Sequence, residues 1–379
     1  MKICFTGDVF LGGDLLHRSC ENVVESKVFN NADVRVVNLE QAVSDSQYIE
    51  EKCTLYTGSY ALKKLKELKI NAVNLAHNHI QDKGLDGIAE TIYHLDSFDI
   101  KNYGAGVNAK AASQPYWVTE SIAILGYCDF EKQYLRQVEI AEENKPGVNP
   151  LRLNKIKSDL DNLPVGKKAI IYFHWGMEHV WLPPGEDIDL AKLLLEDERV
   201  ITIIGMHSHR AQGVVNHAGK QAFMCLGNFL FPNFYITPPT QLSYLTDEEK
   251  TNTKFITRQY HKVYEATYKK WRLVNRVSII LEFCTENKTI NPVFVVQDDN
   301  APVIKELSGI RLYVFRTLFK ILTVLYKLPG PIYKKLHQLN AIEMNSLWRL
   351  QIIFFYLKQL GLKKFSKEVS DYLRKKTSK

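Results

Sequence analysis

Apolar runs and stretches of helical periodicity alternate along residues 1–300, which is the pattern of consecutive βαβ units. The runs are apolar throughout instead of alternating between apolar and polar residues, so the strands that they predict are covered on both faces. The predicted strands are Lys2–Phe5, Val34–Asn38, Ala72–Leu75, Ile122–Gly126, Ala169–Phe173, Val200–Ile204 and Ala222–Leu226. The predicted helices are Tyr60–Leu68, Gly87–Leu95 and Ile188–Glu196. This order of elements predicts a fold of the α/β class.

The pattern changes twice after this region. Residues 235–262 have no hydrophobic period and predict a loop or lid. The runs Val277–Phe283 and Pro292–Val296, separated by a short polar turn, predict a hairpin that completes the sheet. From about residue 303 the pattern is helical, apolar and basic, with a break at Leu328–Pro331. We therefore expect a domain over residues 1–300, followed by a basic helical C-terminal extension over residues 301–379.

The positive net charge of the chain comes from this extension. Residues 301–379 carry 16 Lys and Arg against 4 Asp and Glu, a net charge of +12, and residues 1–300 carry the other 33 basic and 38 acidic residues, a net charge of −5. An acidic domain argues against a nucleic acid as partner, because binding one needs clustered Lys and Arg. The 6 Cys are scattered along the chain, which predicts reduced thiols. No signal peptide is visible, so the expected location is the cytoplasm.

Polar side chains with metal-binding chemistry follow six of the predicted strands. In chain order they are Asp8, then Asn38 and Glu40, then Asn74 with His77, Asn78 and His79, then His174 and Glu178, then His207 and His209, and last Asn228. Ligands of alternating α/β folds bind at this carboxyl edge of the sheet. Imidazole and carboxylate groups suit borderline divalent ions such as Mn, Fe, Zn or Ni, and the number of candidate ligands favours two ions. A pair of ions about 3.5–4 Å apart can clamp a phosphoryl group and supply a hydroxide near neutral pH.

Two local patterns lie within this set. The spacing of His207 and His209 predicts two imidazoles on the same side of an extended segment. The run Asn74–Asp82 concentrates imidazole, amide and carboxylate groups where a strand gives way to a helix. A simple capping turn, in which Asn78 and Asp82 hold backbone groups, is the alternative for that run. The agreement among six strand ends favours a metal site over this alternative.

Six motifs resemble, in order and spacing, those of the CapA/PgsA family, which is associated with bacterial capsule and poly-γ-glutamate synthesis and is related to the calcineurin-like metallophosphoesterases. They are Gly7-Asp8, Asn38-Leu39-Glu40, Asn78-His79-x-x-Asp82-x-Gly84, His174-Trp175-Gly176-x-Glu178, Gly205-x-His207-x-His209-x-x-Gln212 and Gly227-Asn228-Phe229. The resemblance covers roughly residues 1–300. It implies a metallophosphatase-like layered α/β/β/α sandwich. The chain departs from the family at two positions: His77 stands where Asn is common, and His179 stands where an aromatic residue is common. It departs from the superfamily in lacking a His two positions after Asp8.

The resemblance also implies which residues hold the metal. The implied ligands are Asp8, Glu40, Asn78, His174, His207 and His209. Among them Glu40 would be the carboxylate that bridges two ions, and Asn78 would bind through its carbonyl oxygen. The implied cofactor is therefore a pair of divalent ions, Mn, Fe or Zn.

Three further residues have implied catalytic roles. His79 would reach the substrate and could donate a proton to a leaving alkoxide. Asp82 would orient His79, as carboxylates near metal sites often do for imidazoles. Glu178 would contact either the substrate or a metal ligand.

Three hypotheses about function follow. The first is a metal-dependent phosphoester hydrolase of the CapA type, acting on a phosphorylated or anionic substrate in the formation of capsule or another extracellular polymer. The second is hydrolysis of an amide or peptide bond in a poly-γ-glutamate-like chain. The third is a non-catalytic accessory or scaffold subunit of a polymer synthase. A serine hydrolase is disfavoured because the chain has no G-x-S-x-G motif.

Residues 303–379 raise a separate question. Arg316, Lys320, Thr323 and Lys327 form one stripe of a helix whose other face is apolar. The charges inside this run argue against a helix that spans a membrane. The segment could bind an anionic membrane surface at the inner face of the membrane, or it could fold on the core, on a second subunit or on a synthase. The sequence leaves these possibilities open.

Overall fold

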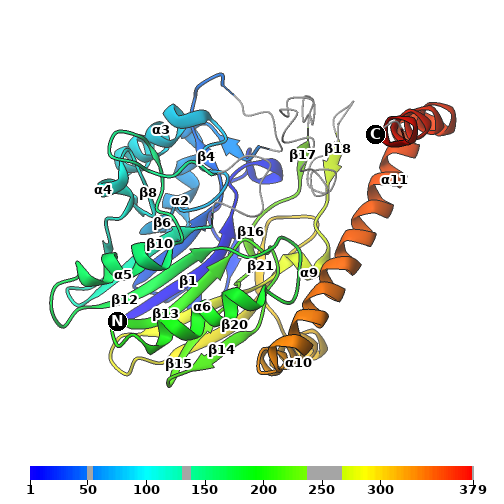
Figure 1. Ribbon diagram of the computed structural model, residues 1–379. Helices are drawn as coiled ribbons and strands as arrows, with labels where there is room; N and C mark the ends of the chain where they lie inside the picture. The colour runs from blue at the N-terminus through cyan, green and yellow to red at the C-terminus, as the bar shows by residue number, and fades with distance from the viewer. Residues whose placement is uncertain (49–53, 130–137, 237–266, 378–379) are drawn as a thin grey trace. The chain divides into compact units, whose positions relative to one another are not determined.

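Two β-sheets face each other, and helices cover the outer face of each sheet (Figure 1). The structure is a computed structural model, and it describes residues 1–48, 54–129, 138–236 and 267–377. The larger sheet has the strand order β2 (Val24–Glu25), β21 (Ile304–Glu306), β20 (Ile290–Gln297), β19 (Val277–Cys284), β1 (Lys2–Val9), β3 (Val34–Leu39), β6 (Ala72–Asn74) and β7 (Lys101–Tyr103), and β16 (Asn228–Leu230) also pairs with β1. The smaller sheet has the order β14 (Val214–His217), β15 (Lys220–Phe223), β13 (Val200–Met206), β12 (Lys168–His174), β10 (Ile122–Cys128) and β9 (Tyr116–Trp117).

Shorter elements connect these strands. Within the residues that the structure describes, three strand pairs stand outside the two sheets: β4 (Ala42–Val43) with β5 (Tyr56–Thr57), β8 (Ala105–Gly106) with β11 (Gly147–Val148), and β17 (Phe234–Ile236) with β18 (Thr267–Lys269). The α-helices are α1 (Lys27–Asn30), α2 (Lys63–Glu67), α3 (Gly84–Ser97), α4 (Ala109–Ala112), α5 (Leu153–Asp161), α6 (Gly185–Glu196), α9 (Leu273–Arg276), α10 (Gly309–Leu325) and α11 (Gly330–Thr377). The 3₁₀ helices are η1 (Gly13–Leu15) and η2 (Ser59–Leu62).

The elements predicted from the hydrophobic pattern are present. Six of the seven predicted strands are found, as β1, β3, β6, β10, β12 and β13, and the predicted hairpin is the antiparallel pair β19 and β20. The seventh, Ala222–Leu226, overlaps β15 only at Ala222 and Phe223, because β15 ends at Phe223. The predicted helix Tyr60–Leu68 is divided between η2 and α2, and the other two lie within α3 and α6. The five cysteines that the structure describes are free thiols. Most of the predicted loop or lid, residues 237–262, lies outside the described residues.

Three apolar clusters define the layers. One cluster fills the space between the sheets and includes Phe5 and Val36 from the larger sheet and Tyr172 from the smaller. A second lies between the larger sheet and its helices, and α3 contributes Ile88 and Leu95 to it. A third lies between the smaller sheet and α5 and α6. Each sheet is therefore buried on both faces, which is why its strands are apolar throughout. The expected α/β/β/α sandwich is confirmed.

Parallel pairing brings the polar strand ends together. In the larger sheet β1, β3, β6 and β7 are parallel, and their register places Asp8 opposite Asn38 and Asn38 opposite Asn74. In the smaller sheet β10, β12, β13 and β15 are parallel, and His174 lies opposite Met206 at the end of β13. Parallel strands end at the same edge, so side chains far apart in the sequence become neighbours there.

The C-terminal helices follow the hairpin. The described chain divides into two compact units, of which the first contains both sheets, α10 and α11 as far as His337, and the second contains Ile236, Thr267 and residues 338–377. The helix α11 is interrupted at Gly361, where φ is 68°. None of the helices in the described part of the chain is both long and apolar enough to cross a membrane. The division of the chain after residue 300 stays a prediction.

Candidate metal centre

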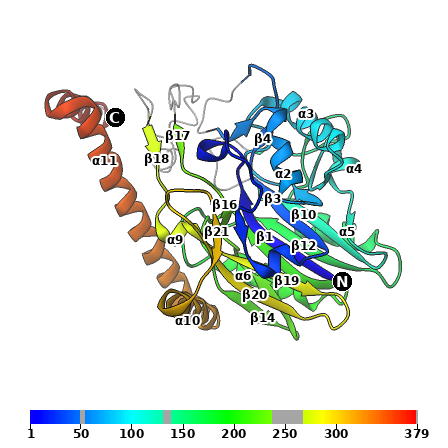
Figure 2. The ribbon, with the colours of Figure 1, turned by 180° about the vertical axis from the view of Figure 1, so that it is seen from behind.

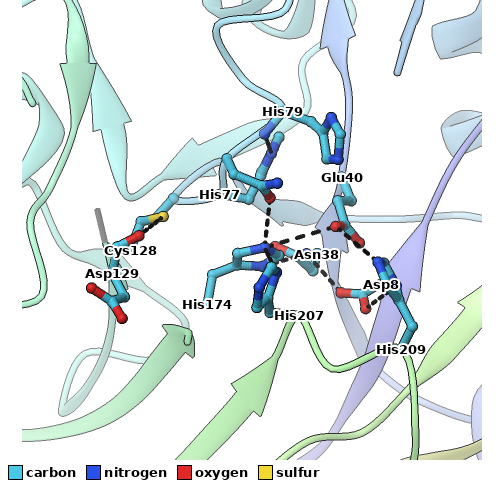
Figure 3. Close-up of polar contacts among 12 residues, drawn as sticks. Asp8, Asn38, Glu40, His77, His79, Cys128, Asp129, His174, His207 and His209 are labelled. Carbon is cyan, nitrogen blue, oxygen red and sulfur yellow. Dashed lines mark hydrogen bonds and ion pairs between the residues drawn. The ribbon is translucent and has the colours of Figure 1, made fainter. Parts of the chain in front are cut away.

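Five buried side chains point toward one another at the shared edge of the two sheets (Figure 3). They are Asp8, Glu40, His174, His207 and His209, and each is 0–5% exposed. Asp8 is the penultimate residue of β1, and Glu40 directly follows β3. His174 ends β12, and the other two histidines follow β13 in the smaller sheet. Both sheets therefore contribute to one site.

These side chains form two groups that share Glu40. One group is Glu40, His174 and His207, and the other is Asp8, Glu40 and His209. In each group the nitrogen and oxygen atoms that could bind an ion lie within 4.8 Å of one another. The Nε2 atoms of His174 and His209 are both 3.7 Å from Oε1 of Glu40. A shared carboxylate between two groups is the arrangement that a pair of bridged ions requires.

The predicted amide ligand joins the first group. Asn78 Oδ1 and His207 Nδ1 each lie 2.9 Å from His174 Nε2. These three atoms are all able to donate an electron pair to a cation, and they converge within hydrogen-bonding distance of each other. The first group thus offers two imidazoles, an amide oxygen and a carboxylate, and the second offers one imidazole and two carboxylates.

Three of the four carboxylate oxygens of Asp8 and Glu40 lack a hydrogen-bond donor in the described structure. Within the described part of the chain, no donor hydrogen-bonds either carboxylate oxygen of Glu40 or Oδ2 of Asp8, although all three atoms are buried. A buried carboxylate without a donor or counter-ion is strongly destabilising. A bound cation removes this penalty, and the mixture of nitrogen and oxygen donors suits Mn, Fe or Zn. The residues present therefore fit a divalent metal.

The electrostatics of the site favour cation binding. Burial, together with the nearby Asp8 and Glu178 carboxylates, raises the pKa of Glu40 well above its ordinary value. Burial also lowers the pKa of His174 well below its ordinary value, as do the neighbouring histidines, and it lowers the pKa of His207 to about 4. Both imidazoles are consequently neutral at pH 7, which is the state that binds a metal.

A comparison of this chain with known families decides its membership. The family model described as "Bacterial capsule synthesis protein PGA_cap" matches residues 2–233. The chain belongs to this family. The resemblance to the CapA/PgsA family drawn from the six motifs is confirmed.

Several curated proteins are similar to this PGA_cap protein. It is 25% identical over 256 residues to the "PGA biosynthesis protein CapA" of Bacillus subtilis (strain 168), an alignment that covers 61% of this chain and 63% of the relative. It is 25% identical over 250 residues to the "Capsule biosynthesis protein CapA" of Bacillus anthracis, covering 61% and 60%. It is 26% identical over 201 residues to a "Probable polyglutamine synthesis accessory protein" of Mycobacterium tuberculosis, covering 50% and 53%. The chain thus spans less than two thirds of the length of each of these relatives.

One solved structure was also compared. The crystal structure of TT1561 of Thermus thermophilus aligns with 62% of this chain and 93% of its own, with a TM-score of 0.34 and 12% identity. A similarity this low carries no argument about function.

In this PGA_cap protein a row of amides orients the Asp8 side of the site. Asn74 Nδ2 donates to Asn38 Oδ1 at 2.8 Å, and Asn38 Nδ2 donates to Asp8 Oδ1 at 2.8 Å. The hydrogen bond to Oδ1 fixes the carboxylate with Oδ2 toward His209 Nδ1, 3.5 Å away. On the other side, Asn228 Oδ1 lies 2.8 Å from His209 Nδ1, which leaves Nε2 of that ring toward Glu40. Partners of this kind fix the orientation of ligand rings.

The predicted pair of His79 and Asp82 is in contact. His79 Nδ1 lies 2.7 Å from Asp82 Oδ2, and the same oxygen accepts a hydrogen bond from the backbone N–H of Leu55 at 2.6 Å. The His79 backbone N–H also donates to Nδ1 of His77 at 3.2 Å. Both side chains of the pair are buried, at 9% and 0% exposure. This geometry fits an oriented imidazole, and the catalytic role of the pair stays a prediction.

Glu178 is half-buried and electrostatically coupled to the site. Burial alone would raise its pKa, but His207, His209 and Lys269 outweigh this effect and lower the pKa below its ordinary value. Glu178 is therefore ionised at neutral pH, and its pKa is shifted in the opposite direction to that of Glu40. Its assignment to the substrate or to a ligand stays a prediction.

The expected extended segment around His207 and His209 is wrong. The backbone φ angles are 86° at His207 and 54° at His209, both in the left-handed region that non-glycine residues seldom adopt. The two rings nevertheless reach the same site, with centroids 6.3 Å apart. The backbone here is held by hydrogen bonds from Asn275 Nδ2 to the His209 carbonyl oxygen and from the His179 N–H to the Ser208 carbonyl oxygen. Strained backbone of this kind is concentrated at functional sites.

Sequence reasoning missed two residues that surround His209. The Trp271 ring lies 5.5 Å from the His209 ring, measured between centroids, and 5.9 Å from the ring of His179. Asn275 in α9 holds the His209 carbonyl oxygen, as described above. Both lie beyond the residues that the family model matches, and neither stands at a predicted strand end. No signal in the sequence pointed to them.

Proposed function

We propose that this protein is a divalent-metal-dependent phosphoester hydrolase that works in capsule or poly-γ-glutamate biosynthesis, on a phosphorylated or anionic polymer-related substrate. The observation that carries the proposal is Glu40, a fully buried carboxylate without a hydrogen-bond donor in the described structure, common to two groups of ligand atoms. Asp8, His209 and Glu40 would hold one ion. Asn78, His174, His207 and Glu40 would hold the other, and each would be Mn, Fe or Zn.

The side chains of the site divide the work between binding and proton transfer. The bound ions would supply an activated water and stabilise negative charge on phosphoryl oxygens. His79 would donate a proton from Nε2 to the leaving alkoxide, because its Nδ1 is engaged by Asp82. The Asp82 carboxylate would hold the ring in place and stabilise its positive charge before the proton is given up.

Metal analysis and a hydrolysis assay test this proposal together. Purified protein would be analysed for bound metal and, after treatment with EDTA, assayed with Mn, Fe or Zn on a phosphomonoester, a phosphodiester and a γ-glutamyl amide. We expect phosphoester hydrolysis to fall by more than ~100-fold in Glu40→Gln and His174→Ala, because changes to groups that only orient ligands already cost about 10–100-fold. His217→Ala is the control, since His217 pairs with Glu196 at the surface. Cleavage of the amide alone would favour the peptide-hydrolase alternative.

A non-catalytic role in the same process is the second candidate. One relative is named as an accessory protein of polyglutamine synthesis. In that case the protein would be a scaffold for a polymer synthase, with residues 303–379 as a binding element for the synthase. Absence of both metal and hydrolysis from correctly folded protein would favour this role.

A further inference from the structure

The helix α10 has two apolar faces, and only one of them packs against the core. Phe315 and Leu322 are buried, and the Phe319 ring contacts that of Phe294 at 5.5 Å between centroids. The Thr323 hydroxyl accepts a hydrogen bond from the Val214 N–H, and the Tyr326 hydroxyl, just after the helix, accepts one from the Gly213 N–H. These contacts dock α10 against β14 and β20 (Figure 2). Part of the tail therefore folds on the core.

The second apolar face is exposed. It consists of Ile310, Tyr313, Val314, Ile321 and Val324, which are 51–83% exposed and are called the outer face below. At 100° per residue these five positions fall within an arc of about 100° on the helix, so they form one stripe. Thr317 is the polar residue within this arc. Single exposed apolar residues are ordinary, but several of them on one helix face mark an interaction surface.

Basic residues border this stripe. Arg316 and Lys320 lie along one side of it and Arg311 lies on the other, and Lys327 follows in the turn after the helix. No acidic residue occurs in the sequence between Glu306 and Glu343. None of the four basic side chains forms an ion pair with another residue that the structure describes. The outer face thus combines apolar side chains with uncompensated positive charge.

We propose that the outer face of α10 binds the surface of a membrane that contains anionic phospholipid. Apolar side chains inserted among acyl chains, with flanking Lys and Arg at the level of the phosphates, are the features of a helix lying in the membrane interface. A second copy of this chain fits less well, because an isologous contact would place basic edges against each other. The proposal concerns where the protein is held and is independent of the hydrolase activity proposed above.

Vesicle sedimentation with the full chain tests the proposal. The probes are vesicles of phosphatidylcholine alone and vesicles with phosphatidylglycerol added. We expect the wild type to pellet with the anionic vesicles and not with the neutral ones. The double variants Ile321→Ser/Val324→Ser and Arg316→Glu/Lys320→Glu should each lower the partition coefficient at least ~10-fold, and the second should remove most of its salt dependence. The substituted side chains are exposed, so folding should be unaffected.

Matched controls and a second measurement make the outcome decisive. Val165→Ser/Leu193→Ser and Lys63→Glu/Lys157→Glu change exposed apolar and basic residues elsewhere and should pellet like the wild type. Equal pelleting of wild type and α10 variants, or no pelleting at all, would overturn the proposal. Analytical ultracentrifugation adds one further result that would overturn it, namely a dimer that the α10 variants dissociate, since this would assign the outer face to a second copy.

Discussion

Glu40→Gln tests the central claim, because it should stabilise the metal-free protein and abolish stabilisation by metal. Gln is nearly isosteric with Glu but cannot carry a negative charge. Without a cation, the wild type buries a carboxylate with no hydrogen-bond donor in the described structure and with Asp8 close by. Relief of an unsatisfied buried polar group of this kind is worth about 1–3 kcal/mol. The metal-free variant should therefore unfold at the same temperature as the metal-free wild type or several degrees higher.

Added metal should reverse this order of unfolding temperatures, so that the wild type becomes the more stable protein. A ligand present at 100 times its dissociation constant stabilises a protein by about 2.7 kcal/mol per site. At about 2–4 °C per kcal/mol for domains of 150–250 residues, the wild-type Tm should rise by roughly 5–10 °C per ion, and somewhat less in a chain of this size. Glu40→Gln should show little rise, because Glu40 belongs to both groups of ligand atoms.

The pH dependence of the metal-free proteins gives an independent check. The pKa of Glu40 is raised in the folded state above its ordinary value of 4.5, so the folded protein binds more protons than the unfolded protein above pH 4.5. The stability that Glu40 contributes is then present below this pH and is lost as pH rises toward the folded-state pKa. The difference between the wild type and Glu40→Gln in the pH dependence of the free energy of unfolding removes the contribution of the histidines and leaves that of Glu40. The assay is chemical denaturation in EDTA at several pH values. A variant that is equally destabilised with and without metal, at all pH values, would refute the reasoning.

Four other outcomes follow from the site. Metal binding should release protons over the pH range in which the raised pKa keeps Glu40 partly protonated, because a bound cation favours the carboxylate. Calorimetry at several pH values in buffers of different ionisation enthalpy measures this release, and heats that are independent of the buffer at every pH would contradict it. Burial lowers the pKa of His207 to about 4, so the metal-free folded protein binds fewer protons than the unfolded chain between pH 4 and 6.5. Up to about 3 kcal/mol of stability should therefore be lost as pH falls through this window. His207→Gln should weaken this pH dependence of the free energy of unfolding. Asp82→Asn should lower kcat about 10–100-fold without changing the metal content, because Asp82 contacts His79 and belongs to neither ligand group. Loss of metal in this variant would contradict the prediction and would show that Asp82 supports the metal site. Gly7→Ala should destabilise the protein by several kcal/mol in denaturant unfolding, because its Cβ would meet a backbone carbonyl oxygen at 1.7 Å; a change under 1 kcal/mol would show that β1 can move.

The sequence was sufficient to predict the strands and the polar groups that follow them, because burial on both faces makes each strand a continuous apolar run. It also placed Glu40 and His174 correctly at strand ends. It did not predict the length of β1, which continues past Phe5 to Val9 although Thr6, Gly7 and Asp8 interrupt its apolar run. That extension pairs on one side with β3, through Asn38, and on the other with β16, through Asn228, which is about 220 positions away from Asp8. No local pattern encodes such a pairing.

Local periodicity also failed around His207 and His209. An i, i+2 spacing indicates a common face only if the backbone is extended. Here left-handed φ angles are imposed by contacts from elsewhere, including the hydrogen bond from Asn275, which is 66 residues away. Trp271 was missed for the same reason, because its place beside His209 is determined by tertiary packing.

The amide row explains why the site can exist before any ion binds. Asn74, Asn38 and Asp8 come from three adjacent parallel strands, and their hydrogen bonds follow the register of the sheet. The orientation of the Asp8 carboxylate is therefore fixed by the same ladder that holds the larger sheet together. Because Asp8 lies within β1 and Glu40 directly follows β3, the sheet limits the movement by which the two carboxylates could separate. The proximity of Asp8 and Glu40 therefore persists in the folded protein, where it helps to raise the pKa of Glu40, and a cation bound between them would offset it.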